Sequence, residues 1–477
     1  LDLQGFIDLD GHLGGNLEHP YFKGEVNGEE ILVNGEKLTE LSGSLESNGR
    51  ETNKLDIRFK QPYKDDESNY GLFTADLNLN IDQKYMHGKV LTLWGNLGGI
   101  LRMAKQDLNI DGTAQGELVF APKGKGSGVN IAISADDVKI HDLNYHRMQL
   151  NGRFLKGVLN IDDVVLQETE NVSDKGIITA EGSVDLRKKY YDMSLEAVKA
   201  NPAIVTAFMA EPPAITGEMD LAMYLKGAFS DPTGKADLVI NNGSVSGVTV
   251  DKLTANLTMD DDKINLVELQ ANKDIYGIKA FGEIPLDLLR EKARRRNSKA
   301  QMNIEVDLSN ARLAMLPALT KLVEWGNGET HGKITLAGTL EDPLVLGSIE
   351  IPEGSVKLKD VDTVIDKIHA DVKFEGRTIL LNDLSAVLGK GKVAASGSYA
   401  LREDADIPYG LKIIAENAEL ASEIFSGKIN SNIEIVPQEY RDFARKQGNQ
   451  PAPLAHRPLI KGAVKLDNVL VNMPTVP

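Results

Sequence analysis

The sequence predicts an all-β protein: an elongated repeat array of antiparallel strands that forms a curved, open apolar groove, with short helices between repeats. Apolar and polar residues alternate with period 2 over most of the 477 residues, which places every second side chain on one face of a sheet. Turn sequences such as Asn241–Gly243 and Glu353–Gly354 separate the alternating runs and favour antiparallel hairpins over βαβ crossovers. One turn pattern also recurs about every 110 residues, which indicates a repeat architecture.

The recurring turn consists of Pro, three further residues, Gly or Ala, and then an apolar strand. Its copies begin at Pro20, Pro232, Pro343 and Pro458, with a looser copy at Pro122. Residues 225–286 align with residues 336–401 as two equivalent units. The chain therefore divides into repeat units 1–105, 106–215, 216–330 and 331–426, and 427–477 begins a fifth.

Short helical interruptions are expected between units, at Leu91–Lys105, Pro202–Ala210, Ala311–Trp325 and Ala418–Phe425. In the third, an apolar stripe with helical spacing is formed by Leu313, Leu316, Leu319, Leu322 and Val323. The simplest interpretation is that these helices dock on the rim or the interior of the groove. The alternative is that they gate it and split it into segments.

Period 2 fits both a string of β-sandwiches and one continuous sheet. The continuous sheet is favoured because flexible linkers are absent, aromatic residues make up only 5% of the chain, and both ends resemble the interior of a sheet. The chain is therefore expected to be a fragment of a longer protein. Two stretches interrupt the alternation of strands: a basic segment at Arg290–Ser298 and a Pro- and Gln-rich loop at Arg445–Pro458.

A continuous sheet would carry one apolar face along its length, and an apolar face of that size marks a binding surface or a membrane contact. The alternative is that a second sheet closes the groove into an ordinary core. The candidate groove residues are Leu238, Ile240, Val245, Leu253, Leu257, Met259, Ile264, Leu266, Leu269, Ile349, Ile351, Val356, Leu358, Ile368, Val372, Phe374, Ile379, Leu381, Leu384 and Val393.

Composition excludes several classes of function. A formal charge of −17 argues against a nucleic-acid partner, which would require a basic face. The absence of cysteine removes disulfides, thiol catalysis and zinc–thiolate sites. No apolar run reaches the roughly 18 residues of a membrane-spanning helix. We therefore predict no catalytic residues, no metal and no cofactor.

Three motifs fall short of a functional site. His141 and His146 are five residues apart, which would place them on opposite faces of a strand. Asp260–Asp262 lacks the spacing of a calcium loop and indicates a hairpin turn. The Gly/Lys runs at 124–128 and 389–392 lack the frame of a phosphate-binding loop.

The ordered recurrence of these features resembles the TamB proteins of the wider AsmA-like envelope group. The residues that carry the resemblance are 336–338, Asp342-Pro343, Gly347, 354–356 and 391–397, with their equivalents around Asp231-Pro232. The resemblance covers most of the chain and is weakest near residues 63–103. The Arg445–Pro458 insertion departs from it.

The resemblance implies a periplasmic body that is folded as a curved β-taco and is anchored in the inner membrane by a segment outside this chain. It also implies that an apolar groove carries phospholipid acyl chains between the inner and outer membranes, and that some members have an outer-membrane Omp85-type barrel as a partner. Three alternatives stay open: an assembly or translocation factor for outer-membrane proteins that offers strand edges, a structural β-repeat spacer or adhesin with a closed core, and, last, an enzyme.

Overall fold

The structure is a computed structural model. It describes residues 2–471 except 17, 19, 50–51, 64–65, 107, 122–127, 171–175, 208–213, 246, 261–262, 274–275, 286–300, 316–321, 340–341, 401–409, 423–424 and 437–458.

The described residues are almost entirely β-strand, as the alternation predicts. The first thirteen strands are β1 (Leu3–Gly15), β2 (Pro20–Val33), β3 (Glu36–Ser47), β4 (Asn53–Tyr63), β5 (Asp66–Asn80), β6 (Tyr85–Asn96), β7 (Ile110–Ala121), β8 (Gly128–Ile140), β9 (Leu143–Leu155), β10 (Val158–Gln167), β11 (Ile177–Asp185), β12 (Tyr190–Ala200) and β13 (Ile215–Ala228). The others are β14 (Asp231–Val245), β15 (Val248–Asp260), β16 (Lys263–Lys273), β17 (Tyr276–Pro285), β18 (Met302–Arg312), β19 (Val323–Gly338), β20 (Pro343–Leu358), β21 (Ile365–Gly376), β22 (Thr378–Leu388), β23 (Gly391–Ala400), β24 (Gly410–Ala421), β25 (Phe425–Val436) and β26 (Leu459–Val471).

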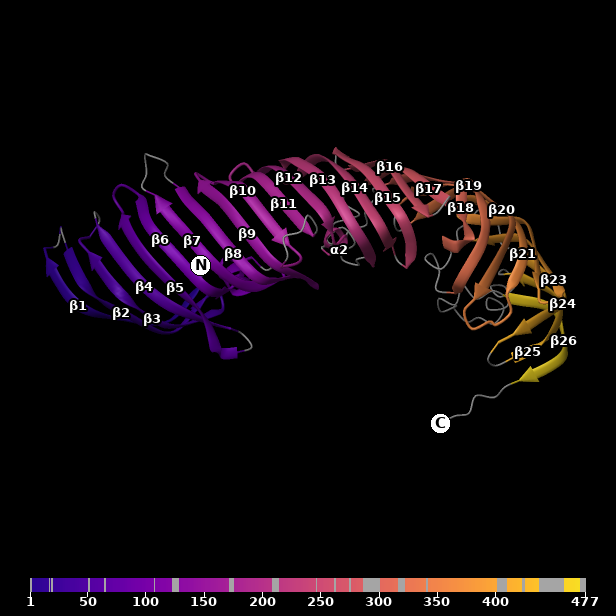
Figure 1. Cartoon of the computed structure of the whole chain (residues 1–477), viewed down its shortest axis with the longest axis horizontal. Helices are drawn as coiled ribbons and strands as arrows, with labels where there is room; N and C mark the ends of the chain where they lie inside the picture. The colour runs from indigo at the N-terminus through magenta and orange to yellow at the C-terminus, as the bar shows by residue number, and fades with distance from the viewer. Residues whose placement is uncertain are drawn as a thin grey trace, which may run out of the picture. The chain divides into compact units, whose positions relative to one another are not determined.

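The 26 strands described belong to one antiparallel sheet. Each strand pairs with the next along the chain from β1 to β13 and again from β15 to β26, and Figure 1 shows these neighbours side by side in chain order. The chain forms two compact units: unit 1 is Leu1–Phe208 with Glu218–Ala236, and unit 2 is Met209–Gly217 with Asp237–Pro477. The predicted meander and all-β class are confirmed, whereas the division into five repeat units stays a prediction.

In the part of the chain that the structure describes, three short helices interrupt the strands: α1 (Leu97–Met103), α2 (Ala203–Thr206) and the 3-10 helix η3 (Leu313–Met315). They follow β6, β12 and β18, so each comes after a sixth strand. They lie inside three of the predicted intervals but are shorter. Residues 91–96 continue β6, 311–312 end β18, and 323–325 begin β19. Residues 208–210 and 316–321 lie outside the described residues.

The helix predicted at Ala418–Phe425 is wrong. Residues 418–421 continue β24, and Phe425 begins β25. Ala418 pairs with Ile429 of β25 and is buried. Pairing with the neighbouring strand therefore overrides the high helix propensity of the Ala, Glu and Leu residues in this segment.

The strand pairing brings the recurring turn's glycine against the neighbouring strand. Gly347 pairs with Ile334 on one side and Phe374 on the other. Its φ is +122°, and a Cβ built there would lie 2.0 Å from the carbonyl oxygen of Lys333. Only glycine therefore fits without a shift of the backbone. Gly347 therefore lets the backbone of β19 pass closely.

Burial is low for a chain of this length. The accessible surface is 29246 Å², whereas a compact monomer of this size would expose about 17,000 Å². The buried residues concentrate toward the strand ends that carry the helices, such as Ile31, Leu38, Ala114 and Ala135 in unit 1 and Val323, Val356 and Ala370 in unit 2. We call these ends of the strands the helix rim of each unit and the opposite ends the open rim.

Candidate functional site: an apolar face on each unit

Seventeen of the twenty predicted groove residues lie on one face of unit 2. Cross-strand partners share a face, and the partners link this set from β15 to β23: Leu257 with Leu266, Ile349 with Val372, and Phe374 with Ile379. The other three, Leu238, Ile240 and Val245, lie on β14. The structure thus brings together side chains that the alternation assigned to one face. Their role in lipid contact stays a prediction.

In β20, odd-numbered and even-numbered apolar residues lie on the same face of the sheet. Ile349 and Ile351 occupy odd positions, whereas Val356 and Leu358 occupy even ones. The pairing with β21 shifts register between Ile351 and Gly354. Such a β-bulge inserts one extra residue into the strand, so the side chains that face the apolar side change from odd to even positions. Ile351, Val356 and Leu358 consequently pack in one cluster.

Unit 1 carries an equivalent apolar face that the predicted set does not include. Its side chains are linked by the pairs Leu118–Ile131, Ile131–Gly152 and Ile161–Gly152 and continue through β11 to β13. The signal in the sequence is the same period-2 alternation, for example in Val129, Ile131 and Ile133.

Each apolar face has a buried part and a half-exposed part. The half-exposed part lies toward the open rim, and we call it the open lane. In unit 1 the open lane consists of Leu55, Ile57, Leu77, Val90, Leu118, Phe120, Val129, Ile131, Leu150, Phe154, Leu159, Ile161, Val184, Met193 and Leu195. In unit 2 it consists of Leu257, Met259, Ile264, Ile284, Ile304, Val306, Ile334, Leu336, Val345, Ile349, Val372, Phe374, Ile379, Leu381, Ile413 and Ile433.

The helix rim is a core of the ordinary kind. In unit 2, Leu313 of η3 packs with Val323, Val356, Ile368 and Ala370 in one buried cluster. Of the predicted groove residues, Val356 and Ile368 are therefore covered by the chain itself, and Ile240, Leu253 and Leu266 are buried as well.

The residues predicted to form an apolar stripe along a helix in the third interruption do not lie along one helix. Leu313 and Val323 are buried, whereas Leu322 is 73% exposed. Leu316 and Leu319 lie outside the described residues. η3 packs against β19 and β20 near the helix rim, which agrees with docking on the rim; gating stays a prediction.

At the helix rim of unit 1, α1 makes polar contacts with several strands. The Asn96 side chain accepts a hydrogen bond from the Gly99 N–H at 2.5 Å and donates one to Asp111 of β7 at 3.1 Å. At the other end of the helix, Arg102 pairs with Glu36 at the start of β3. The Asn34 side chain donates to the Met103 carbonyl at 2.6 Å. α1 thus connects β7 back to β3 and covers buried Phe73 and Gln61 on its way.

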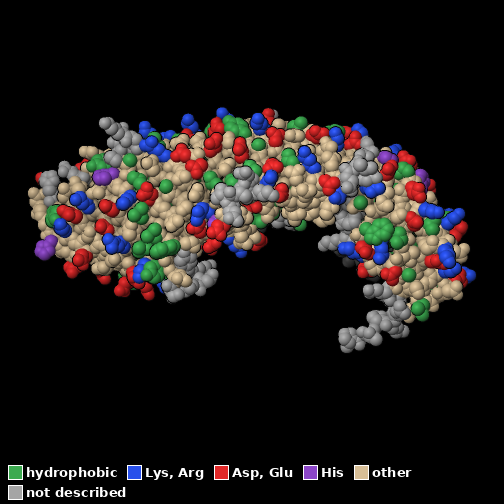
Figure 2. All heavy atoms as spheres, in the orientation of Figure 1, with side chains coloured by type: hydrophobic (Ala, Val, Ile, Leu, Met, Phe, Trp, Pro, Cys, Tyr) green, Lys and Arg blue, Asp and Glu red, His purple; other side chains and the backbone are tan. Residues whose placement is uncertain are grey.

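The opposite face of each unit is polar. In unit 2 it carries cross-strand ion pairs, among them Lys279–Glu268, Lys263–Glu283 and Lys333–Glu305, and Figure 2 shows acidic and basic side chains interspersed over the strands. Exposed pairs of this kind stabilise a fold by only about 0–1 kcal/mol each. Their main effect is to keep this face in water.

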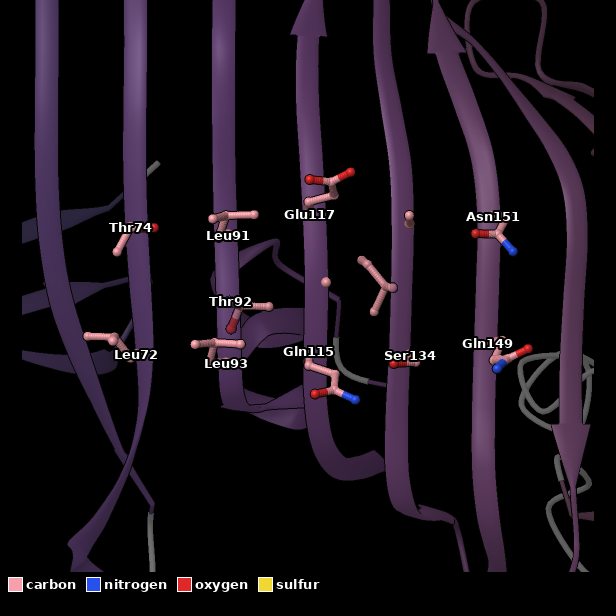
Figure 3. Close-up of a pocket in the computed structure, with 13 residues that line it drawn as sticks. Leu72, Thr74, Leu91, Thr92, Leu93, Gln115, Glu117, Ser134, Gln149 and Asn151 are labelled. Atoms are coloured by element: carbon pink, nitrogen blue, oxygen red, sulfur yellow. The ribbon is translucent and has the colours of Figure 1, made fainter. Parts of the chain in front are cut away.

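A hollow of about 710 Å³ lies on the polar face of unit 1, over β5 to β9. Figure 3 shows Leu72, Leu91 and Leu93 along one side of it and Gln115, Gln149 and Asn151 along the other. The pairs Leu72–Leu93 and Gln115–Ser134 place these side chains opposite the open lane. The hollow is thus separate from the apolar face.

The remaining sequence candidates occupy turns. His141 lies in the turn between β8 and β9 rather than in a strand, so the expected strand spacing to His146 does not apply. Asp260 ends β15 and pairs with Lys263, as in a hairpin. Within the described part of the chain, no group of three or more His, Asp or Glu residues could hold a metal ion. The basic segment, the Pro- and Gln-rich loop and most of residues 124–128 lie outside the described residues.

The described part of the chain contains no helix that is long and apolar enough to cross a membrane. The strands instead define a class of protein: a many-stranded antiparallel sheet with one polar and one apolar face, in which the described residues place no second sheet over the apolar face.

Residues 167–382 match the family model described as the TamB C-terminal domain. The resemblance seen in the sequence is supported over this region of the chain. The match supports a TamB-like envelope protein. Searches of the curated proteins and of the solved structures found no significant match.

Proposed function

We propose that the chain conducts phospholipids between the inner and outer membranes through its apolar faces and thereby supports outer-membrane homeostasis. The observation that carries the proposal is the open lane: a row of half-exposed apolar side chains that runs from strand to strand in each unit. In this proposal the chain acts in the periplasm, an inner-membrane segment outside the chain anchors it, and an Omp85-type barrel is a candidate partner at the outer membrane.

The physical basis is the transfer of acyl chains from one apolar environment to another. Each methylene group that leaves water gains about 0.8 kcal/mol, and the open lane can supply that gain outside a bilayer. Headgroups would stay in water at the open rim. The lane side chains of β18 and β19, Ile304, Val306, Ile334 and Leu336, carry no polar group that would hold one lipid in place, so lipids can move along the lane without a deep trap.

The direct test places a charge in the open lane. Leu336→Asp puts a carboxylate among acyl chains, where an unpaired charge is costly, and should reduce co-purified phospholipid several-fold as measured by native mass spectrometry. Outer-membrane integrity should fall with it.

Thr335→Asp is the matched control. Thr335 is next in sequence, pairs with Glu305 and Leu346, and lies on the polar face. The substitution adds the same charge and the same low strand propensity without entering the lane. Equal lipid content in both variants, with both folded and abundant, would count against the proposal. So would a wild-type chain that carries no lipid and takes up none from fluorescently labelled vesicles.

A further inference from the structure

The open rim of unit 1 carries a cluster of cations that the proposed function does not yet use. Lys156 lies in the turn between β9 and β10, and Arg187, Lys188 and Lys189 lie in the turn between β11 and β12. All four side chains are exposed. In a chain of net charge −17, four cations on two neighbouring turns are a local reversal of sign.

Backbone hydrogen bonds hold these turns next to one another. The Leu186 N–H donates to the Gly157 carbonyl at 2.9 Å, and the Phe229 N–H, in the turn after β13, donates to the Lys189 carbonyl at 2.8 Å. Within the middle turn, Asp185 accepts from the N–H groups of Arg187 and Lys188, each at 3.0 Å. These bonds, with the Lys188 N–H first, lower the pKa of Asp185, so its carboxylate stays ionised and keeps the turn in shape at neutral pH.

Large apolar side chains stand exposed among the cations. Leu186 is 56% exposed and Phe229 is 46% exposed. The ring of Phe229 stacks on Tyr191, with centroids 5.9 Å apart. Tyr191 pairs with Val184, and Val184 pairs with Leu159 of the open lane. The exposed apolar side chains are therefore continuous with the lane.

The cations outnumber the carboxylates of the same turns four to two. Asp185 is engaged within its own turn, where it also lies 3.8 Å from the Arg187 side chain, and Asp231 is the first residue of β14. Asp192, one strand residue further in, pairs with Lys226 at 3.2 Å rather than with the four cations. The positive charge of the turns is thus only partly offset.

We propose that Lys156, Leu186, Arg187, Lys188, Lys189 and Phe229, here named the basic tip, bind the surface of an anionic phospholipid membrane. Basic side chains next to an anionic leaflet are attracted to it, and exposed Leu and Phe side chains insert at the headgroup boundary. This proposal rests on the proposed function for its purpose, because it would hold the open rim of unit 1, beside the lane residues of β10 to β12, against a leaflet while acyl chains pass between them.

The test measures partition of the whole chain onto vesicles by flotation. Wild-type protein should bind vesicles of phosphatidylethanolamine with phosphatidylglycerol, should bind phosphatidylcholine vesicles far less, and should be released as NaCl rises from about 0.05 M to about 0.5 M because salt screens the attraction. Neutralising the tip with Lys156→Gln, Arg187→Gln, Lys188→Gln and Lys189→Gln should weaken partition about fivefold for each cation removed. Leu186→Ser with Phe229→Ser, which keeps every charge, should weaken it as well.

The matched control neutralises four exposed lysines on the polar face of unit 2: Lys279→Gln, Lys333→Gln, Lys373→Gln and Lys412→Gln. The net charge changes equally, at exposed positions on the polar face, where Lys279, Lys333 and Lys373 are paired with carboxylates. Equal loss in the tip variant and the control would overturn the proposal, as would wild-type binding that is the same on neutral vesicles or absent on anionic ones. Inorganic phosphate at matched ionic strength should not displace the chain, and full displacement would assign the tip to free phosphate instead. Leu336→Asp should keep vesicle binding, which separates failure of the tip from failure of the lane.

Discussion

Gly347 illustrates at the scale of one residue how the sheet brings neighbouring strands into close contact. Its φ of +122°, together with the 2.0 Å that would separate a Cβ here from the Lys333 carbonyl oxygen, leaves no room for a side chain. Gly24 and Gly462, which occupy the same place in the recurring turn, meet the carbonyl oxygens of Asp10 and Asn432 in the same way. In these three copies the turn therefore brings two strands into close approach, whereas the Pro232 copy carries Ala236 at this place.

The corresponding prediction concerns stability. Gly347→Ala should lower the free energy of unfolding by at least about 2 kcal/mol, because it combines a strained φ with a backbone clash. Urea unfolding followed by circular dichroism measures this. Gly410→Ala is the control, since a Cβ at Gly410 meets nothing within 4 Å, and it should stay within about 0.5 kcal/mol of wild type. Equal effects would show that the close approach does not constrain this position.

Which residues share a face could be predicted from the sequence because period 2 is a local property of the strand. The alternation assigns Ile349, Val372 and Leu381 to one face in this way, and their pairing places them there. How deeply each is buried could not be predicted. Val356 and Leu336 look alike in the sequence, yet Val356 is buried under Leu313 of η3 and Leu336 is half-exposed. Burial depends on which rim the helices cover, and that follows from the topology.

At the scale of elements, the short helices close one rim of the apolar face and leave the other open. α1 does this by linking β3, β4, β6 and β7 through polar contacts at both of its ends. The break in alternation after β6 signals that a helix exists here. It does not signal the start at Leu97, because residues 91–96 pair with β5 and β7 and the strand continues until the Asn96 cap.

Asn96 should control how firmly α1 is held. Asn96→Ala removes the side-chain acceptor for the Gly99 N–H and the bond to Asp111 and should cost roughly 1–2 kcal/mol. Hydrogen exchange of residues 97–103 should quicken accordingly. Asn96→Ser keeps a capping oxygen and should recover at least half of the loss. If Ser and Ala variants exchange equally fast, the capping bond is not what holds the helix.

At the scale of the whole molecule, the two units repeat one arrangement: a polar face with ion pairs, an apolar face, a buried helix rim and an open lane. Lipid transport in series would require both lanes to function, whereas simple storage would require only one. A charge placed in one unit distinguishes these two cases, because the lane residues of unit 1 and unit 2 can be changed independently.

Ile131→Asp in unit 1 should therefore abolish lipid delivery to the outer membrane while the lane residues of unit 2 stay unchanged. A photo-crosslinking residue at Val306 reports lipid in unit 2, and outer-membrane permeability reports delivery. The physical reason is that a carboxylate among acyl chains raises the barrier at one point of the path without changing lane residues elsewhere. Asn130→Asp is the control, since Asn130 pairs with Val119 and Arg153 on the polar face and should leave both readouts unchanged. Persistent delivery in the Ile131→Asp variant, with crosslinking at Val306 intact, would show that lipids reach the outer membrane without passing the lane of unit 1.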